Sequence, residues 1–233
     1  MDLSISEEQS AIRDVISRFI ENEYDFEKRM SIAEGDSAFD SDAYNFFVEQ
    51  GFTAIPFSEE DGGLNGGPVE TMLIMKEIGR GLVLEPYLEN VILAGGVLKR
   101  LATDDQKSKW LSNIINGELQ STLAFTEPQS RFNLNDVATV AKENGDKVII
   151  NGKKSFVLNG KEADIIIVPA RTSGSQTEAE GISLFVVESD LPGISKNNYK
   201  SVDGHSASEI TFKNVEVNKD NLLGEIGKGY QTL

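Results

Sequence analysis

Few residues of this chain have the side-chain chemistry of a self-contained catalytic site. The single histidine, His205, has no cysteine and no second histidine with which to bind a metal ion. The lack of cysteine also excludes disulfides and thiolate nucleophiles. Carboxylates are abundant, but no nucleophile, base and orienting acid stand out as a set. The residue types therefore predict no metal centre, and His205 is interpreted as a surface or packing residue.

A glycine-rich run and two strand-like segments are more informative. Residues 61–67 read DGGLNGG and predict a loop, but no Lys-Ser/Thr follows them, so a phosphate-binding function is weakly supported. Residues 123–130 read LAFTEPQS, and residues 151–160 read NGKKSFVLNG. Taken alone, each of these two segments predicts a strand followed by a turn.

The composition is that of an acidic globular chain. Its 233 residues suit one large domain or two ordinary ones, and 39% of them are hydrophobic, enough for real cores. The formal net charge of -16 disfavours nucleic acid and anionic membrane surfaces as partners. The acidic N-terminus predicts no signal peptide, and no apolar run approaches the roughly 18 residues of a membrane span. A soluble, cytoplasmic protein is therefore expected.

Residues 1–118 carry helical patterns. Ser6 and Gln9 form an S-x-x-Q capping box ahead of apolar residues at helical spacing. Similar signals predict helices that begin near Ser41, Pro68, Pro86 and Thr103. The helix from Pro68 is expected to bury one apolar stripe, made of Val69, Met72, Leu73 and Ile78. The only tryptophan, Trp110, is interpreted as packing.

From residue 119 onward the apolar spacing changes to that of strands. Strands are expected over residues 121–126, 137–142, 147–151, 154–158, 164–170, 182–188 and 209–217. The apolar run 165–168 predicts a strand buried on both faces, and the polar stretch 172–180 predicts a mobile loop. The sequence therefore predicts an α+β fold, with an all-helical domain over residues 1–118 and a small antiparallel β-barrel or sandwich over residues 119–233.

In a chain whose helices precede its strands, the segments 123–130 and 151–160 together resemble the acyl-CoA dehydrogenase family. There the first segment is a hydrophobic pair with Thr-Glu-Pro, and the second is Asn-Gly-x-Lys, an aromatic, an aliphatic residue, Thr and Asn-Gly. The tail LLGEIGKG from Leu222 is similar to the family's passage into a C-terminal four-helix bundle, which is expected to be absent here. GGPVETM, LEPY and EPQSR, which begin at residues 66, 84 and 127, resemble the pimeloyl-CoA dehydrogenase small-subunit type.

The resemblance implies FAD as cofactor and α,β-dehydrogenation of an acyl-CoA thioester as the reaction. In the family a carboxylate removes the α proton, hydride passes from the β carbon to flavin N5, and an electron-transfer flavoprotein accepts the electrons. A desolvated slot raises the pKa of the base, and hydrogen bonds to the thioester carbonyl acidify the α carbon. The family's catalytic glutamate lies in the third domain, so no catalytic residue is assigned in this chain.

The same resemblance implies a set of FAD-binding residues: Leu123, Phe125, Thr126, Phe156, Val157 and Leu158. Thr126 would hydrogen-bond the pyrimidine edge of the flavin, and Phe156 takes the place of the aromatic residue that stacks beside the ring. The alternatives are a strand-end hydroxyl that caps the turn for Thr126 and an ordinary core residue for Phe156.

Two departures from the family pattern concern the same segments. Leu158 stands where a threonine usually hydrogen-bonds flavin N5, and leucine has no hydroxyl. The usual Gly-Ser turn after Glu-Pro is replaced by Gln-Ser-Arg-Phe. In the replaced turn, Arg131 adds a cation that would meet a phosphate group. Phe132 would fill space that a small residue normally leaves for substrate or cofactor. Both residues are therefore expected to bind substrate.

Two functions follow from the resemblance. The first is FAD-dependent dehydrogenation of an acyl-CoA as part of a full-length or heteromeric enzyme, with this chain alone inactive. The second is a non-catalytic structural subunit of a heteromeric acyl-CoA dehydrogenase, with cofactor and base supplied by the other chain. Both imply a homo- or hetero-oligomer, with a large-subunit dehydrogenase as the partner. A third alternative, an unrelated α+β binding module, does not account for the paired motifs.

Overall fold

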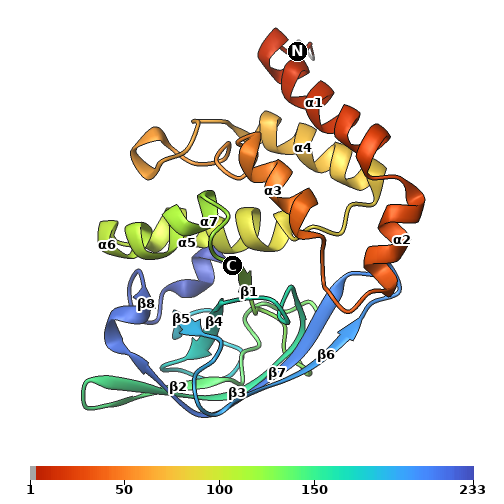
Figure 1. Cartoon of the computed structure of the whole chain (residues 1–233). Helices are drawn as coiled ribbons and strands as arrows, with labels where there is room; N and C mark the ends of the chain where they lie inside the picture. Colours follow the sequence, from red (N-terminus) through yellow and green to blue (C-terminus); the bar gives the residue numbers. More distant parts are fainter. Residues whose placement is uncertain (1–3) are drawn as a thin grey trace.

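The computed structural model describes residues 4–233 and shows a helical layer stacked on a β layer (Figure 1). The helices come first along the chain and the main strands follow, with the change between Ile115 and Ser121. The predicted order of an α part and then a β part is therefore confirmed. None of the helices in the described part of the chain combines the length and the apolar character needed to cross a bilayer.

The first four helices follow the local signals closely. They are α1 (Glu7–Glu23), α2 (Phe26–Glu34), α3 (Ser41–Glu49) and α4 (Pro68–Gly81). At α1, Gln9 N–H donates to Ser6 Oγ at 3.1 Å and Ser6 N–H donates to Gln9 Oε1 at 2.9 Å, so the capping box is confirmed. Helix α2 was not predicted, because only one of its residues, Ile32, is buried and its apolar pattern is weak.

The rest of the helical part consists of two continuous runs and one short 3-10 turn. The π-helix η2 (Tyr87–Ala94) leads into α5 (Gly95–Leu101), and α6 (Asp104–Gln106), η3 (Lys107–Leu111) and α7 (Ser112–Ile115) form the second run. The turn η1 (Glu59–Asp61) lies in the loop before α4. Trp110 is 3% exposed within the core, which confirms its packing function.

The predicted apolar stripe of α4 is half wrong. Leu73 and Ile78 are buried, but Val69 and Met72 are 41% and 54% exposed. Ile74 is completely buried and takes their place. The helix packs on α1, so the face centred on Leu73, Ile74 and Ile78 is turned inward and the face of Val69 and Met72 lies beside it in solvent.

One mixed sheet makes up the β part. Its strands are β1 (Ser121–Leu123), β2 (Val140–Asn144), β3 (Lys147–Leu158), β4 (Ile165–Arg171), β5 (Ile182–Glu188), β6 (Ile194–Lys200), β7 (Ser206–Asn218) and β8 (Leu222–Leu223). The order is β6-β7-β3-β2-β4-β5-β8, and β1 pairs with β4. The 3-10 turns η4 (Lys219–Asn221) and η5 (Gly229–Thr232) flank β8.

The prediction of a purely antiparallel barrel or sandwich needs correction. Strand β4 runs parallel to β1 and, at one register position, to β2. The edge strands β6 and β8 are not paired with each other, so the sheet is not a closed barrel. Two predicted strands, over residues 147–151 and 154–158, are one strand, β3, which bends at two register shifts. Edge strand β6 was missed because ISKNNYK is mostly polar and exposed.

Two hydrophobic cores lie on opposite faces of the central strands. Ile165 and Ile167 of β4 belong to the core shared with the helices, whereas Ile166 and Val168 belong to a second core inside the sheet. The prediction that residues 165–168 form a strand buried on both faces is therefore confirmed. Because one core spans helices and sheet, the two parts of the chain are packed into one unit.

Polar contacts add to this packing where α2 meets β6 and β7, on the right of Figure 1. Lys200 Nζ, at the end of β6, donates to the carbonyl oxygens of Ile32, Ala33 and Gly35 at 2.9, 2.6 and 2.6 Å. These carbonyls lie at the C-terminal end of α2, where a cation is favoured by the helix dipole.

Candidate functional site

The two motif segments singled out in the sequence meet at one place on the sheet. Ser155 N–H, on β3, donates to the carbonyl oxygen of Thr126 at 2.9 Å. Thr122 Oγ1, in β1, donates to the carbonyl oxygen of Leu158 at 2.7 Å. These two hydrogen bonds tie the stretch after β1 to the end of β3, so the tertiary structure brings Thr126 and Phe156 together.

A β-bulge turns Phe156 toward solvent. Lys154 pairs with Ile210 and Val157 pairs with Ser208, so Ser155 and Phe156 together face the single residue Glu209. Phe156 has a φ of 49° and is 49% exposed. A bulky residue in this left-handed region costs about 1–2 kcal/mol, and bulges of this kind re-aim side chains beside active sites. The interpretation of Phe156 as an ordinary core residue is therefore excluded.

The segment after β1 presents hydrogen-bond donors that the chain does not use. Within residues 4–233, nothing accepts from the backbone N–H of Phe125, the backbone N–H of Thr126 or the Thr126 hydroxyl. Both residues are partly exposed. The pyrimidine edge of a flavin carries two carbonyl oxygens and one ring nitrogen that accept hydrogen bonds, and the ring system has flat, apolar faces. Unpaired donors beside an outward-facing aromatic ring therefore fit this group.

A buried ion pair lies behind this surface. Lys154 Nζ is 2.6 Å from Glu127 Oε1, and Glu127 Oε2 accepts from the Ala138 N–H at 2.8 Å. Burial lowers the pKa of Lys154 to about 8, although the charge and hydrogen bond of Glu127 act in the opposite direction. Burial raises the pKa of Glu127, but Lys154 and the other donors outweigh it and leave that pKa below its usual value. The ion pair therefore links Glu127, which follows Thr126, to Lys154, which precedes the bulge of β3.

Arg131 and Phe132 lie on the loop that follows Glu127. Both are exposed, and Phe132 is 99% exposed. The sequence predicts that the Phe132 ring fills space near substrate or cofactor, but among the described residues it fills none. Arg131 has a φ of 49° and its guanidinium has no partner within residues 4–233. The structure therefore leaves both side chains free, and their function in substrate binding stays a prediction.

The loop over residues 172–180, predicted to be mobile, is anchored by Arg171. Its Nη1 donates to the carbonyl oxygens of Glu178 and Glu180 at 2.8 and 2.7 Å. Its Nη2 donates to those of Gln176 and Asn135 at 2.7 and 3.0 Å. Because Asn135 belongs to the Arg131 loop, Arg171 holds the two loops together.

The other predicted cofactor residues are placed differently. Val157 is 2% exposed in the core inside the sheet, and Leu123 is 8% exposed in the core shared with the helices. Leu158 is partly exposed. Of the six residues predicted to bind FAD, Phe125, Thr126 and Phe156 thus form the accessible surface, with Leu158 beside it. Alternation along β3 sends Val157 to the other face, as the pleat requires.

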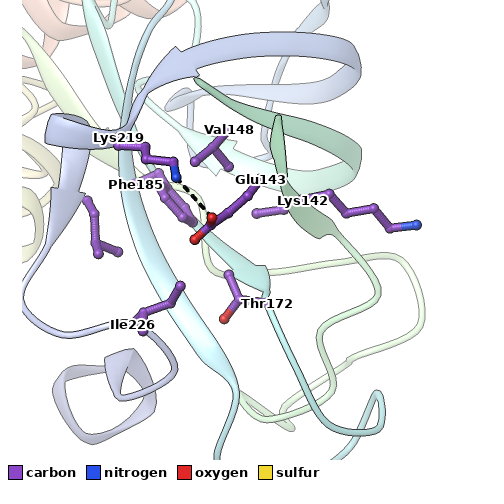
Figure 2. A pocket seen from close by; sticks show the side chains of 9 residues that line it. Lys142, Glu143, Val148, Thr172, Phe185, Lys219 and Ile226 are labelled. Carbon is purple, nitrogen blue, oxygen red and sulfur yellow. Dashed lines mark hydrogen bonds and ion pairs between the residues drawn. The ribbon is translucent and has the colours of Figure 1, made fainter. Parts of the chain in front are cut away.

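A separate cavity lies elsewhere on the sheet (Figure 2). It measures about 370 Å³ and is lined mainly by apolar side chains, among them Val148, Phe185 and Ile226. At its edge Lys219 Nζ pairs with Glu143 Oε2 at 2.9 Å, and Lys142 points away from the cavity. It contains none of the predicted site residues and no unpaired charge directed into it. The residues that the structure describes contain no group of three or more His, Cys, Asp or Glu that could hold a metal ion.

Sequence reasoning missed Glu209 and the buried position of Lys154. The pair Lys153-Lys154 within a strand was a signal, because neighbouring strand residues point to opposite faces and one lysine must point inward. Such a lysine needs a buried carboxylate, which Glu127 provides. Glu209 carries no local signal, because its position opposite the bulge depends on the pairing of β3 with β7.

A helical domain joined to a mixed sheet, with an outward-facing aromatic residue at the bulge of β3 and free donors in the segment after β1, defines the class of fold and site. Residues 6–118 match the acyl-CoA dehydrogenase N-terminal domain, and residues 122–215 match the acyl-CoA dehydrogenase middle domain. The chain belongs to the acyl-CoA dehydrogenase family.

Individual relatives agree with this assignment. The chain is 33% identical over 232 residues to the 3-(aryl)acrylate reductase of Clostridium sporogenes, with 97% of this chain and 61% of that protein covered. It is 31% identical to the caffeyl-CoA reductase-Etf complex subunit CarC of Acetobacterium woodii, with 97% and 61% covered. The structure of butyryl-CoA dehydrogenase from Megasphaera elsdenii matches with a TM-score of 0.87 and 27% identity, over 100% of this chain and 62% of that one. The chain thus spans about three-fifths of the length of these relatives.

Proposed function

We propose that the protein takes part in FAD-dependent oxidoreduction at the α,β carbon–carbon bond of an acyl-CoA thioester. The observation that carries this proposal is the juxtaposition of the outward-facing Phe156 ring with the unpaired donors of Phe125 and Thr126. These residues lie in the part of the chain that matches the middle domain of the family. An ordinary sheet surface has no need for an aromatic residue held in a left-handed conformation.

In this proposal the chain binds and orients the flavin. When bound, FAD supplies the hydride acceptor for the reaction. The Thr126 hydroxyl and the N–H groups of Phe125 and Thr126 donate to the pyrimidine edge, where they would stabilise negative charge. Phe156 packs beside the ring and keeps water from it. The guanidinium of Arg131 is free to meet a phosphate, and Phe132 is free to meet the substrate.

Leu158 limits what this chain does by itself. The side chain of leucine cannot donate a hydrogen bond, so a side-chain contact that polarises flavin N5 must come from another residue. We assign no catalytic base in this chain. Leu158 is also the observation that favours the second candidate function, a non-catalytic structural subunit whose partner chain supplies the base and the N5 contact.

The proposed assembly follows from the same reasoning. We propose a homo- or hetero-oligomer in the cytoplasm, with a large-subunit dehydrogenase as partner, as in the pimeloyl-CoA small-subunit type, and an electron-transfer flavoprotein as electron acceptor. One relative is named as a subunit of a reductase–Etf complex, which supports the choice of acceptor. Relatives are named both as dehydrogenases and as reductases, so both directions of the reaction need to be assayed.

The test begins with the complete protein purified alone. A yellow protein whose flavin spectrum bleaches when an acyl-CoA is added under anaerobic conditions would support the enzyme. So would a reduced flavin that an enoyl-CoA reoxidises. A colourless, folded protein that turns over only with a partner chain would support the structural subunit. For residues 1–233 alone we expect weak or no FAD retention and no turnover, and stoichiometric, tightly bound FAD would contradict that expectation.

A further inference from the structure

One carboxylate stands directly beside the Phe156 bulge. Glu209 Oε1 accepts from the Phe156 N–H at 3.3 Å, and Glu209 Oε2 accepts from the Ser155 hydroxyl at 3.2 Å. Glu209 is also the single residue of β7 that faces the two bulged residues of β3. Its side chain therefore satisfies the backbone donor that the bulge removes from the strand ladder.

The carboxylate is itself held in place from two sides. Lys153 Nζ lies 3.1 Å from Glu209 Oε2, and the Tyr199 hydroxyl donates to Glu209 Oε1 at 3.3 Å. Burial raises the pKa of Glu209, but the hydrogen bonds from Lys153, Phe156 and Ser155 outweigh it and leave that pKa below its usual value. Glu209 is therefore an ionised acceptor at neutral pH, with contacts from β3 and β6.

From this geometry we propose that Glu209 is a positioning residue, which holds Phe156 in its left-handed conformation and so aims the ring at the flavin. Without an acceptor for its N–H, the bulge has no group to offset the strain at Phe156. The backbone would then relax toward a regular strand, which directs residue 156 differently because side chains alternate along a strand. The proposal deepens the proposed function and rests on it for the identity of the group that the ring meets.

The experiment compares Glu209→Ala, Glu209→Gln and a matched control, Glu216→Ala, in the complete protein. Glu216 lies on the same strand, is exposed, and has no side-chain partner within residues 4–233. The first readout is the FAD dissociation constant from a flavin fluorescence titration. The second is hydrogen exchange at the Phe156 amide, which does not depend on FAD.

We expect Glu209→Ala to weaken FAD binding about tenfold, the effect of one lost charge-assisted hydrogen bond, and to remove the protection of the Phe156 amide. Glu209→Gln keeps an acceptor oxygen and should restore most of both readouts. Glu216→Ala should change neither. In a Phe156→Gly background, Glu209→Ala should have no further effect on FAD binding, because there is no ring to aim.

Two results would overturn the proposal. One is an unchanged FAD dissociation constant and an equally protected Phe156 amide in Glu209→Ala. The other is a full, additive loss of FAD binding on adding Glu209→Ala to Phe156→Gly, which would show a merely structural function. If the wild-type protein binds no FAD with or without its partner, the proposed function fails. The exchange rate of the Phe156 amide then still shows whether Glu209 holds the bulge.

Discussion

Lys154 Nζ lies 2.6 Å from Glu127 Oε1, and the two side chains are 0% and 1% exposed. The pair links the strand that carries Phe156 to the loop that follows Thr126. Both charges are removed from water, so each one depends on the other for compensation. The stability of the whole surface is therefore sensitive to the loss of either partner.

Lys154→Met should destabilise the protein by roughly 3–5 kcal/mol, because it leaves the Glu127 charge buried without a cation. The double variant Glu127→Gln/Lys154→Met should recover most of this loss, since no charge remains buried and Gln still accepts from the Ala138 N–H. Urea denaturation of the wild-type protein and the variants measures both effects. A double variant as unstable as Lys154→Met would show that compensation of charge is not the cause.

Phe156→Gly should not destabilise the folded protein in the way that loss of a buried phenylalanine does. Glycine adopts the left-handed region without strain, so we expect an unchanged stability or a gain of about 1 kcal/mol. The matched control is Phe185→Ala, which removes a ring that is 1% exposed and should cost roughly 3–5 kcal/mol. Thermal denaturation measures both. A loss at Phe156 as large as that at Phe185 would contradict the view that this ring serves binding rather than the core.

Lys200→Met should loosen the contact between α2 and the sheet. The ammonium group donates to three carbonyl oxygens at the end of α2, and removal of these bonds should cost about 1–2 kcal/mol. Hydrogen exchange in α2 should rise more than exchange in β3. Lys213→Met is the control, because Lys213 is exposed on β7 and its side chain has no partner in residues 4–233. Equal effects of the two variants would contradict a specific capping function.

Glu85→Gln should stabilise the protein near neutral pH. Burial raises the pKa of Glu85 from 4.5 to about 6, and its Oε2 has no hydrogen-bond partner among the described residues. A carboxyl with a raised folded-state pKa makes its full contribution below pH 4.5, and the protein loses that stability as the pH rises to about 6. Above that window the loss amounts to about 2 kcal/mol, which Gln should recover.

The measurement for Glu85 is thermal denaturation at a series of pH values. The wild-type protein and Glu85→Gln should differ little at low pH and diverge between pH 4.5 and about 6. The exposed Glu216→Gln should show no such divergence. A difference between wild type and Glu85→Gln that does not depend on pH would mean that the pKa of Glu85 is the same in the folded and the unfolded protein, which would contradict the raised pKa.

Particular residues show how far the sequence alone could predict the fold. The Ser6–Gln9 capping box and the start of α4 at Pro68 were predicted correctly, because caps depend on residues a few positions apart. The exposure of Met72 was not, because the helix face that is buried depends on how α4 packs against α1. Strand β6 was missed for a related reason, since its pairing with β7 rather than its own polar sequence makes it a strand.

The sequence by itself determined the order of helices and strands, the family resemblance, and the two segments that carry the candidate site. Those features follow from local periodicity and from short runs of residue types. Only the tertiary structure decided that Phe156 faces outward, that Val157 faces the core and that Lys154 meets Glu127. The reason is that each of these depends on the register between strands distant in sequence, and a single bulge opposite Glu209 changes the direction of the side chains around it.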